Sequence, residues 1–180
     1  MLQTHTRYAI HPATAKTLDT DQLRDHFLVD GLFADGKIKL IYSHYDRLIL
    51  GSAVPGTGTL TLDKVAATGT ATFLERREMA VLNVGGTGTV SVAGDTHSLD
   101  KGEVLYIGMD AGPIDFAGAG RFYILSAPAH RTCPTRLIKI SDARRVKMGA
   151  SETSNKRVIL QFLHPEVADS CQLLMGYTRL

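Results

Sequence analysis

The feature that most constrains this chain of 180 residues is a succession of short β-type segments separated by glycine- or aspartate-containing turns. Each segment is rich in β-branched, aromatic or leucine residues, which favour strands. We expect strands at 38–45, 47–53, 59–62, 79–84, 89–92, 96–99, 104–107, 114–117 and 122–127. Many short strands at this spacing are typical of a β-sandwich or closed barrel, not of a sheet that alternates strands with helices.

Local turn signals support this reading. Val92-Ala93-Gly94-Asp95 predicts a tight hairpin, and Asp100-Lys101-Gly102-Glu103 predicts a second turn. The segment VGGTGTV (84–90) has the glycines of a phosphate-binding loop, but a strand follows it instead of a helix. We therefore interpret these glycines as turn residues.

One short helix is predicted near the N-terminus. Asp19 can cap it, Gln22 stands at the third helical position, and Leu23 and Phe27 share one face before Gly31 ends the run. This is the only helix of more than one turn that we expect.

In the last third of the chain, the regular succession of short strands is interrupted by two segments that predict connections. Residues 127–136 form a proline-punctuated connection, and the polar segment 143–157 predicts a link that leaves the first barrel. Strands are expected at 157–164 and 171–178, the second close to the end of the chain. That last strand either pairs back into the first barrel, or the polypeptide is a piece of a longer protein. We thus divide the chain into a first domain (1–140), a linker (141–156) and the opening strands of a second domain (157–180).

Composition excludes several classes of function. Hydrophobic residues make up 44% and charged residues 21%, which predicts a packed globular core. With a net charge of +2 and no long basic run, we expect no nucleic-acid partner. No apolar segment has the length of a signal peptide or a membrane span. Cys133 and Cys171 lack a CxxC spacing and predict reduced thiols, so a cytoplasmic protein without a membrane partner is expected.

Residues 73–108 have the skeleton of a metal-binding cupin barrel, in which a glutamate, Glu78, is followed seven residues later by Gly85. A cupin metal site also needs two histidines separated by one residue and a third from a later strand, because imidazole and carboxylate together suit transition metals. Ala71 and Phe73 stand where the first two would lie, and no histidine follows soon after Gly108. We therefore expect the first barrel to be free of metal.

For each of the other candidate side chains, a purely structural or solvent-exposed role is an alternative to a role in binding. The seven histidines, at 5, 11, 26, 44, 97, 130 and 164, are interpreted as surface or structural residues, with a convergence of His44, Glu75 and His130 left open. The charged run 75–78 either lines a cavity with half of its residues or forms surface and interface ion pairs, which we favour. Arg157 begins an apolar strand and either binds a carboxylate in bidentate fashion or faces water.

Several segments together resemble the 5-keto-4-deoxyuronate isomerase family, also called 4-deoxy-L-threo-5-hexosulose-uronate ketol-isomerases. They are AKTLDTDQLRDHFLVD, YSHYDRLILG, FLERREMAVLNVGGTGTVSVAG, FYILSAPAHRTCPT and TSNKRVILQFLHPEVADSCQLLMGYT. The resemblance implies a mainly β, cupin-like jelly-roll barrel with one short N-terminal helix, the first half of a bicupin. It also implies a homohexamer of pectin and uronate catabolism that acts on a small sugar acid. In that family a divalent metal, usually zinc, is held in the second cupin, by ligands expected beyond Leu180.

The resemblance therefore assigns no catalytic and no metal-ligating residue to this chain, and no cofactor is expected in it. Arg157, Ile159 and Thr178 are the substrate-binding residues it implies: Arg157 for the carboxylate, Thr178 for a sugar oxygen and Ile159 as an apolar wall. Three hypotheses follow: a truncated isomerase with little turnover of its own, an inactive sugar-acid-binding or assembly module, or a protein whose metal ligands come from another chain.

Overall fold

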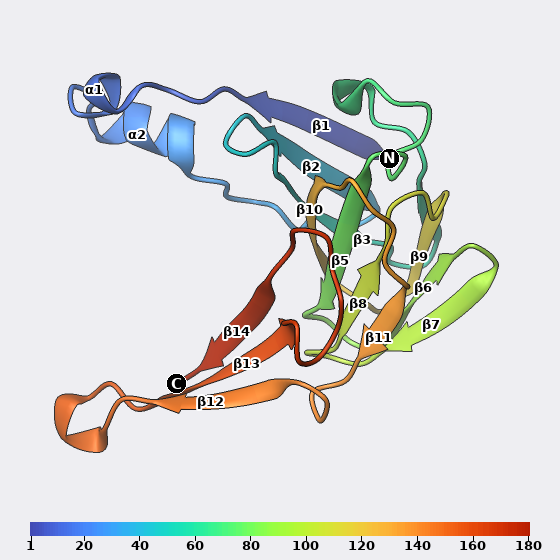
Figure 1. The fold of residues 1–180 in the computed structure, drawn as a ribbon. Coiled ribbons are helices and arrows are strands. Elements are labelled where there is room, and N and C mark those ends of the chain that lie inside the picture. The colour runs from blue at the N-terminus through green and yellow to red at the C-terminus, as the bar shows by residue number, and fades with distance from the viewer.

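The computed structural model describes residues 1–180 and contains fourteen β-strands in three sheets (Figure 1). The largest sheet has the strand order β1–β2–β3–β10–β5–β8–β11. Its strands are β1 (Leu2–Arg7), β2 (Lys37–Ser43), β3 (Ile49–Val54), β10 (Phe122–Pro128), β5 (Arg77–Asn83), β8 (Val104–Ile107) and β11 (Arg136–Ile138). The prediction of a mainly β fold is confirmed.

Two smaller sheets complete the fold. The four-stranded sheet comprises, in order, β4 (Thr59–Leu62), β9 (Ile114–Gly118), β6 (Gly88–Val92) and β7 (Asp95–Leu99). The three-stranded sheet comprises β12 (Arg144–Met148), β13 (Arg157–Leu163) and β14 (Met175–Arg179). The nine strands predicted within residues 38–127 correspond to β2–β10, with ends that agree within two residues.

The first barrel is formed by the seven- and four-stranded sheets, which face each other across a core of 19 buried residues. Alternate residues of β5, Met79 and Val81, point into this core, as do Phe116 and Phe122, whose ring centroids lie 5.4 Å apart. Because side chains alternate between the faces of a strand, the remaining residues of β5 point away from the barrel interior. The seven-stranded sheet therefore has a second face to bury.

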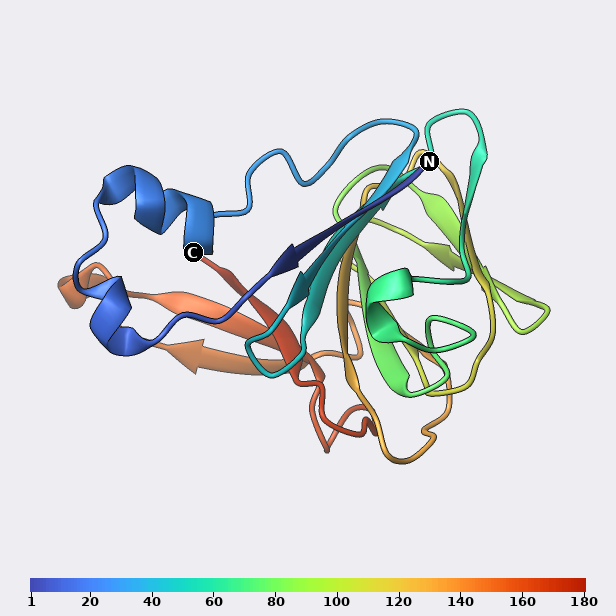
Figure 2. The same ribbon diagram turned by 90° about the horizontal axis from the view of Figure 1, so that it is seen from above.

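That second face packs against the three-stranded sheet through a separate core of 12 buried residues. Ala80 of β5 and Tyr106 of β8 contribute from the barrel, and Leu160 and Phe162 contribute from β13. Phe162 also stacks on Tyr177 of β14, with centroids 5.2 Å apart. Both views place the three-stranded sheet beside the barrel and not within its wall (Figures 1 and 2).

The predicted turns are confirmed. Ala93 and Gly94 have φ of 54° and 88°, which are the left-handed conformations of a two-residue hairpin between β6 and β7. In the glycine-rich turn before β6, a Cβ on Gly85 would lie 2.5 Å from the backbone nitrogen of Arg121. The Asn83 side chain fastens this turn by accepting from Gly85 N and donating to Gly86 O.

The N-terminal region contains more structure than predicted. The helix α2 (Thr20–Phe27) has the expected capping box between Asp19 and Gln22, but it ends at Phe27, before Gly31. Leu23 and Phe27 remain 38% and 51% exposed, so their shared apolar face is not buried. A one-turn helix, α1 (Pro12–Ala15), and the strand β1, which pairs in parallel with β2, were not predicted. Neither helix combines the length and apolarity that crossing a membrane would require.

The predicted linker 141–156 also differs from the structure, because β12 lies within it and pairs with β13 along its whole length. The exposed residues Arg144, Arg145 and Lys147 give this segment the polar composition of a linker. Edge strands commonly carry charged residues too, so the same composition also suits β12. Short 3₁₀ helices occupy Ala66–Thr68 and Ser151–Thr153.

The last strand also differs from its prediction. It begins at Met175 and not at residue 171, and it pairs with β13. The alternative in which it returns to the wall of the first barrel is therefore wrong.

Candidate functional site

The open face of the three-stranded sheet is the candidate site, and it brings together the three substrate-binding residues predicted from the sequence. On β13, Leu160 and Phe162 point into the second core, so Arg157 and Ile159 lie on the opposite face. Thr178 of β14 is in register with Ile159, and directly opposed residues of an antiparallel pair share a face. All three residues therefore lie on the open face.

A hollow of about 250 Å³ lies on this face and is lined by both Ile159 and Thr178. Arg157 does not line it: its Nη1 donates to the carbonyl oxygen of Asn155 at 3.3 Å. The structure thus joins two of the predicted residues in one hollow and places the guanidinium of the third beyond its rim.

Two polar residues of this hollow were missed by sequence reasoning, Gln161 and His164. Gln161 follows Ile159 by two residues, so the strand alternation alone would have placed it on the same face. Its Oε1 accepts from Arg144 Nη1 at 2.7 Å, which leaves the side-chain NH2 without a protein partner. His164 Nδ1 accepts from Glu166 N at 3.2 Å, so a neutral His164 carries its proton on Nε2.

The donor set of the open face does not suit a transition metal. Such an ion needs three or four nitrogen, sulfur or carboxylate ligands that converge on one point. The hollow is lined by one imidazole, one amide and two hydroxyl-bearing residues, Tyr177 and Thr178. Nowhere in the chain do three or more His, Cys, Asp or Glu residues form a group that could hold a metal ion. Residues 1–180 therefore do not fit the metal that the family resemblance implies.

The side chains of His44, Glu75 and His130, whose convergence the sequence left open, do not meet in the structure. The His44 ring stacks on Tyr8, with centroids 4.7 Å apart, and Glu75 Oε2 accepts from Ala71 N at 2.8 Å. His130 Nδ1 lies 3.3 Å from the sulfur of Cys171. The three side chains have separate partners and form no metal-binding group.

Glu78 keeps the cupin spacing to Gly85, but its carboxylate points away from the barrel interior. It is fully buried and accepts hydrogen bonds from the backbone N–H groups of Cys171, Gln172 and Leu173 at 2.6, 2.6 and 2.7 Å. The phenol of Tyr106 donates a fourth, at 2.6 Å. The carboxylate therefore anchors the loop before β14 to the barrel and cannot reach an ion inside it.

The surface or interface ion pairs favoured for the charged run 75–78 are found for Glu75 and Arg76 but not for Arg77 and Glu78. Arg77 is only 5% exposed and Glu78 is fully buried, while Arg76 and Glu75 form the single ion pair of the run, at 3.6 Å. Neither buried charge pairs with an oppositely charged side chain.

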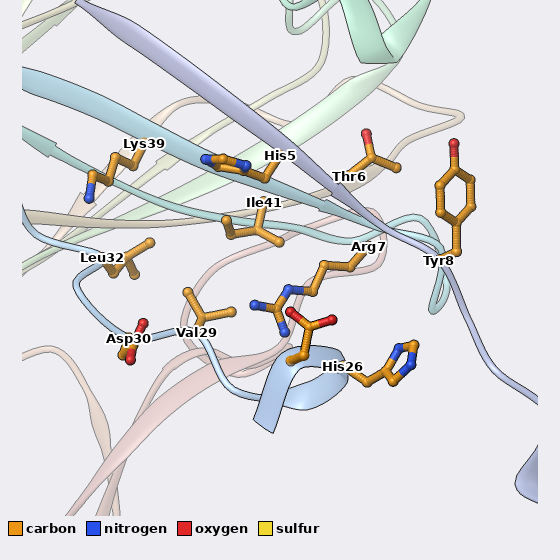
Figure 3. Close-up of a pocket in the computed structure, with 11 residues that line it drawn as sticks. His5, Thr6, Arg7, Tyr8, His26, Val29, Asp30, Leu32, Lys39 and Ile41 are labelled. Atoms are coloured by element: carbon orange, nitrogen blue, oxygen red, sulfur yellow. The ribbon is translucent and has the colours of Figure 1, made fainter. Parts of the chain in front are cut away.

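A larger hollow of about 470 Å³ lies between β1 and the segment that follows α2 (Figure 3). Arg7 and Lys39 line it together with the carboxylates of Asp25 and Asp30, and Arg7 Nη1 is buried there without a hydrogen-bond partner. Since acidic and basic groups are both present, this hollow does not select a ligand of one charge. His5 and His26, interpreted from the sequence as surface or structural residues, also line it.

Comparison with known proteins identifies a family and relatives that match almost the whole chain. Residues 27–179 match the KduI/IolB family. A protein of Agrobacterium fabrum (strain C58) named 4-deoxy-L-threo-5-hexosulose-uronate ketol-isomerase is 55% identical over 180 residues, which are 100% of this chain and 66% of that protein. A protein of the same name from Cereibacter sphaeroides (strain ATCC 17025) is 57% identical over 173 residues, covering 96% of this chain and 63% of that protein. The chain spans just under two thirds of the length of these relatives.

Among solved structures, the crystal structure of an IolB-like protein from Salmonella typhimurium LT2 superposes with a TM-score of 0.57 at 16% identity. The match covers 73% of this chain and 49% of that one, and at this identity it bears on the fold alone. It agrees with the predicted cupin-like barrel. With a family match over most of its length and relatives of the same name at 55% and 57% identity, the chain belongs to the KduI/IolB family.

Proposed function

We propose that this chain carries part of a ketol-isomerase of uronate and pectin catabolism. The reaction converts 5-dehydro-4-deoxy-D-glucuronate into 3-deoxy-D-glycero-2,5-hexodiulosonate. The observation that carries the proposal is the 55% identity, along the whole chain, to a relative named for this ketol-isomerase activity. The chemistry of the open face supports it, because that face offers a cation, a hydroxyl and an apolar wall to a sugar acid.

Each of the three residues has a distinct role in this proposal. Arg157 holds the substrate carboxylate, since a guanidinium matches a carboxylate in bidentate geometry and only its Nη1 has a protein acceptor. Thr178 hydrogen-bonds a sugar oxygen, and the neighbouring Ile159 packs against the carbon skeleton. The NH2 group of Gln161 offers a further donor to the same ligand.

The isomerisation requires catalytic groups in addition to these substrate-binding residues. A proton moves between adjacent carbons while a carbonyl and a hydroxyl exchange places, so a base and a group that polarises the two oxygens are required. A divalent metal such as zinc supplies that polarisation when bound. Because residues 1–180 do not fit such an ion, we place its ligands in the part of the relatives' length that this chain does not span. A homohexamer in the cytoplasm is the assembly and location that we propose for the whole enzyme.

A turnover assay tests the proposal. The 180-residue chain and a full-length relative would be incubated with the 5-keto substrate, each with and without added zinc. We expect turnover from the relative and little or none from the chain. Robust turnover by the chain alone would overturn the placement of the metal ligands outside it.

A second candidate function is a sugar-acid-binding or assembly module without catalysis, and the absence of a metal-binding group among residues 1–180 favours it for the isolated chain. The reading frame beyond Leu180 separates the two: an encoded HxH–Glu segment supports the isomerase, and a stop codon supports the module. If another chain supplies the ligands instead, a metal ion will be found at the boundary between two chains.

Binding to the open face can be measured without catalysis. D-galacturonate is an unreactive sugar acid of suitable size, and its affinity would be determined by calorimetry. We expect Arg157→Gln to weaken binding roughly tenfold, the loss of one charge-assisted bidentate contact. Arg145→Gln is the matched control, since Arg145 is in register with the core residue Leu160 and so lies off the open face. Equal effects of both variants would contradict the assigned role of Arg157.

A further inference from the structure

Arg77 is an unusual residue for the mouth of a β-barrel. It lies at the start of β5, on the same side of the strand as the core residues Met79 and Val81. Its Nε donates to Ser126 Oγ at 3.1 Å, and its Nη2 donates to the carbonyl oxygens of Ser126 and Arg47 at 2.9 and 2.7 Å. Nη1 has no protein acceptor. A guanidinium is thus held rigidly in the barrel mouth with one nitrogen uncommitted.

No carboxylate neutralises this buried charge. Arg77 is 95% buried, being 5% exposed, and none of the ion pairs of the chain includes it. Its neighbours provide only partial compensation, through neutral oxygens and the Tyr42 ring 6.0 Å away. Burial lowers the pKa of Arg77 to about 10, and the nearby charge of Arg47 acts in the same direction. The guanidinium is still charged at neutral pH, and buried charges are normally paired.

A hollow of about 380 Å³ adjoins Arg77, which is within the range of roughly 300–1,000 Å³ typical of small-molecule sites. Every ionisable side chain that lines it, apart from Tyr42, is basic: Arg47, Arg76, Arg77 and His130. Arg47 takes part from a tight turn, where its φ of 54° is left-handed. Gln172 adds an amide from the loop that Glu78 anchors. The donors come from separate segments of the chain and meet at one place.

We propose that this hollow at the mouth of the first barrel is a binding site for a small oxyanion, either a carboxylate or a phosphate. The ligand supplies the negative charge that Arg77 lacks and accepts hydrogen bonds from Arg47 and Arg76. Metal-binding cupins hold a cation in the barrel with histidines and a carboxylate, whereas this barrel turns its glutamate outward and presents a guanidinium. The site is separate from the open face of the three-stranded sheet, and it stands whether or not that face binds substrate.

The test uses the whole 180-residue chain at low ionic strength. Calorimetry would measure the binding of inorganic phosphate, D-galacturonate and the neutral sugar D-galactose, with chloride as the reference anion. In parallel, ¹⁵N-labelled protein would report which backbone amides shift. Arg47→Gln and Arg76→Gln remove a charge from the rim, and Arg77→Met removes the buried one. Arg121→Gln is the matched control: this exposed arginine lies over the Phe33 ring, 5.1 Å from its centroid, and does not line the hollow.

We expect an oxyanion to bind more tightly than chloride and to shift the amides of residues 68–70, 76 and 130. Arg47→Gln and Arg76→Gln should each weaken binding by roughly tenfold, while Arg121→Gln leaves it unchanged. Tighter binding of galacturonate identifies a sugar acid as the ligand class, and tighter binding of phosphate identifies a phosphate ester.

The proposal is overturned if neither oxyanion binds more tightly than chloride, or if the amides of residues 68–70, 76 and 130 do not shift. It is equally overturned if Arg47→Gln and Arg76→Gln bind as the parent chain does. These two variants decide the matter even if Arg77→Met fails to fold, because Arg76 in particular has a side chain that is 79% exposed.

Discussion

The phenol of Tyr106 on β8 donates a hydrogen bond of 2.6 Å to Oε2 of Glu78 on the paired strand β5, at the face of the barrel wall that packs against the three-stranded sheet. The same carboxylate accepts three backbone N–H groups from residues 171–173. A single glutamate therefore fixes the loop that leads into β14, the strand that carries Thr178. The geometry of the open face depends on a residue of the first barrel.

Replacing Glu78 by alanine tests this dependence. The change leaves the phenol and three N–H groups buried without an acceptor, so we expect a loss of at least about 3 kcal/mol in the free energy of unfolding. Urea denaturation measures the loss, and hydrogen exchange should show faster exchange at the amides of 171–173. Glu152→Ala is the control, at an exposed glutamate, with an expected effect within about 0.5 kcal/mol. Unchanged protection of these amides in Glu78→Ala would refute the anchoring role.

Tyr106→Phe tests the same contact through its pH dependence. Burial, and then the hydrogen bond to Glu78, raise the pKa of Tyr106 far above its ordinary value of 10.0. The unfolded chain therefore releases this proton first as the pH rises above 10, and the stability that the phenol contributes is present below that pH and declines above it.

At neutral pH the wild-type chain should be more stable than Tyr106→Phe by about 1.5–3 kcal/mol, the value of a hydrogen bond to a charged group. The difference should shrink from pH 10 upward. Arg77, whose pKa is lowered to about 10, pushes stability the opposite way in this range, but it does so in both proteins. Urea unfolding of the two chains from pH 8 to pH 11 provides the measurement, and a difference that stays constant would contradict the assignment.

Neighbouring residues on β13 should respond very differently to truncation. Leu160 is fully buried in the second core, so Leu160→Ala should cost about 2–5 kcal/mol. Ile159 lies on the open face, and Ile159→Ala should cost less than about 1 kcal/mol while weakening the binding of a sugar acid. Thermal or urea unfolding of both variants checks the face assignment. If Ile159→Ala cost more stability than Leu160→Ala, Ile159 and not Leu160 would face the second core.

The β6–β7 hairpin offers a stabilising change. Ala93 has a left-handed φ of 54°, a conformation that asparagine adopts at lower cost than alanine. Ala93→Asn should therefore raise the free energy of unfolding by about 0.5–1 kcal/mol, whereas the β-branched Ala93→Val should lower it. A melting-temperature comparison of the three chains is sufficient. If asparagine lowers the melting temperature as valine does, the turn geometry is not that of the structure.

Local signals explain which parts of the fold could be predicted. The capping box of Asp19 and Gln22 and the turn at Ala93-Gly94 involve contacts within a few residues, and both were predicted correctly. The strand β1 was missed because its polar residues show no apolar run and its partner, β2, begins 30 residues after β1 ends. The strand β12 was missed for a related reason, since its exposed basic residues suit an edge as well as a linker.

The candidate site was predictable only in part. Strand alternation places Arg157 and Ile159 on one face once β13 is assigned, but the position of Thr178 depends on where β14 begins. That start is delayed to Met175 because Glu78 takes the N–H groups of residues 171–173, 93 to 95 positions away in sequence. No short sequence pattern predicts a contact between residues so far apart in the chain. The burial of Arg77 was equally hidden, because a run of four charged residues ordinarily indicates a solvated surface.

Arg77 and Glu78 are consecutive residues that β5 sends in opposite directions, one positive charge into the barrel mouth and one negative charge into the second core. If β5 slipped by one residue against its neighbours, the carboxylate would face the carbonyl oxygens of Arg47 and Ser126, and the guanidinium would face the three N–H donors that now bind Glu78. Both charges would then be buried beside the wrong partners. The adjacent pair therefore acts as a register lock, and we expect a single-residue insertion or deletion in this strand to abolish folding, whereas the exposed turn at Ala93-Gly94 has room to accept one.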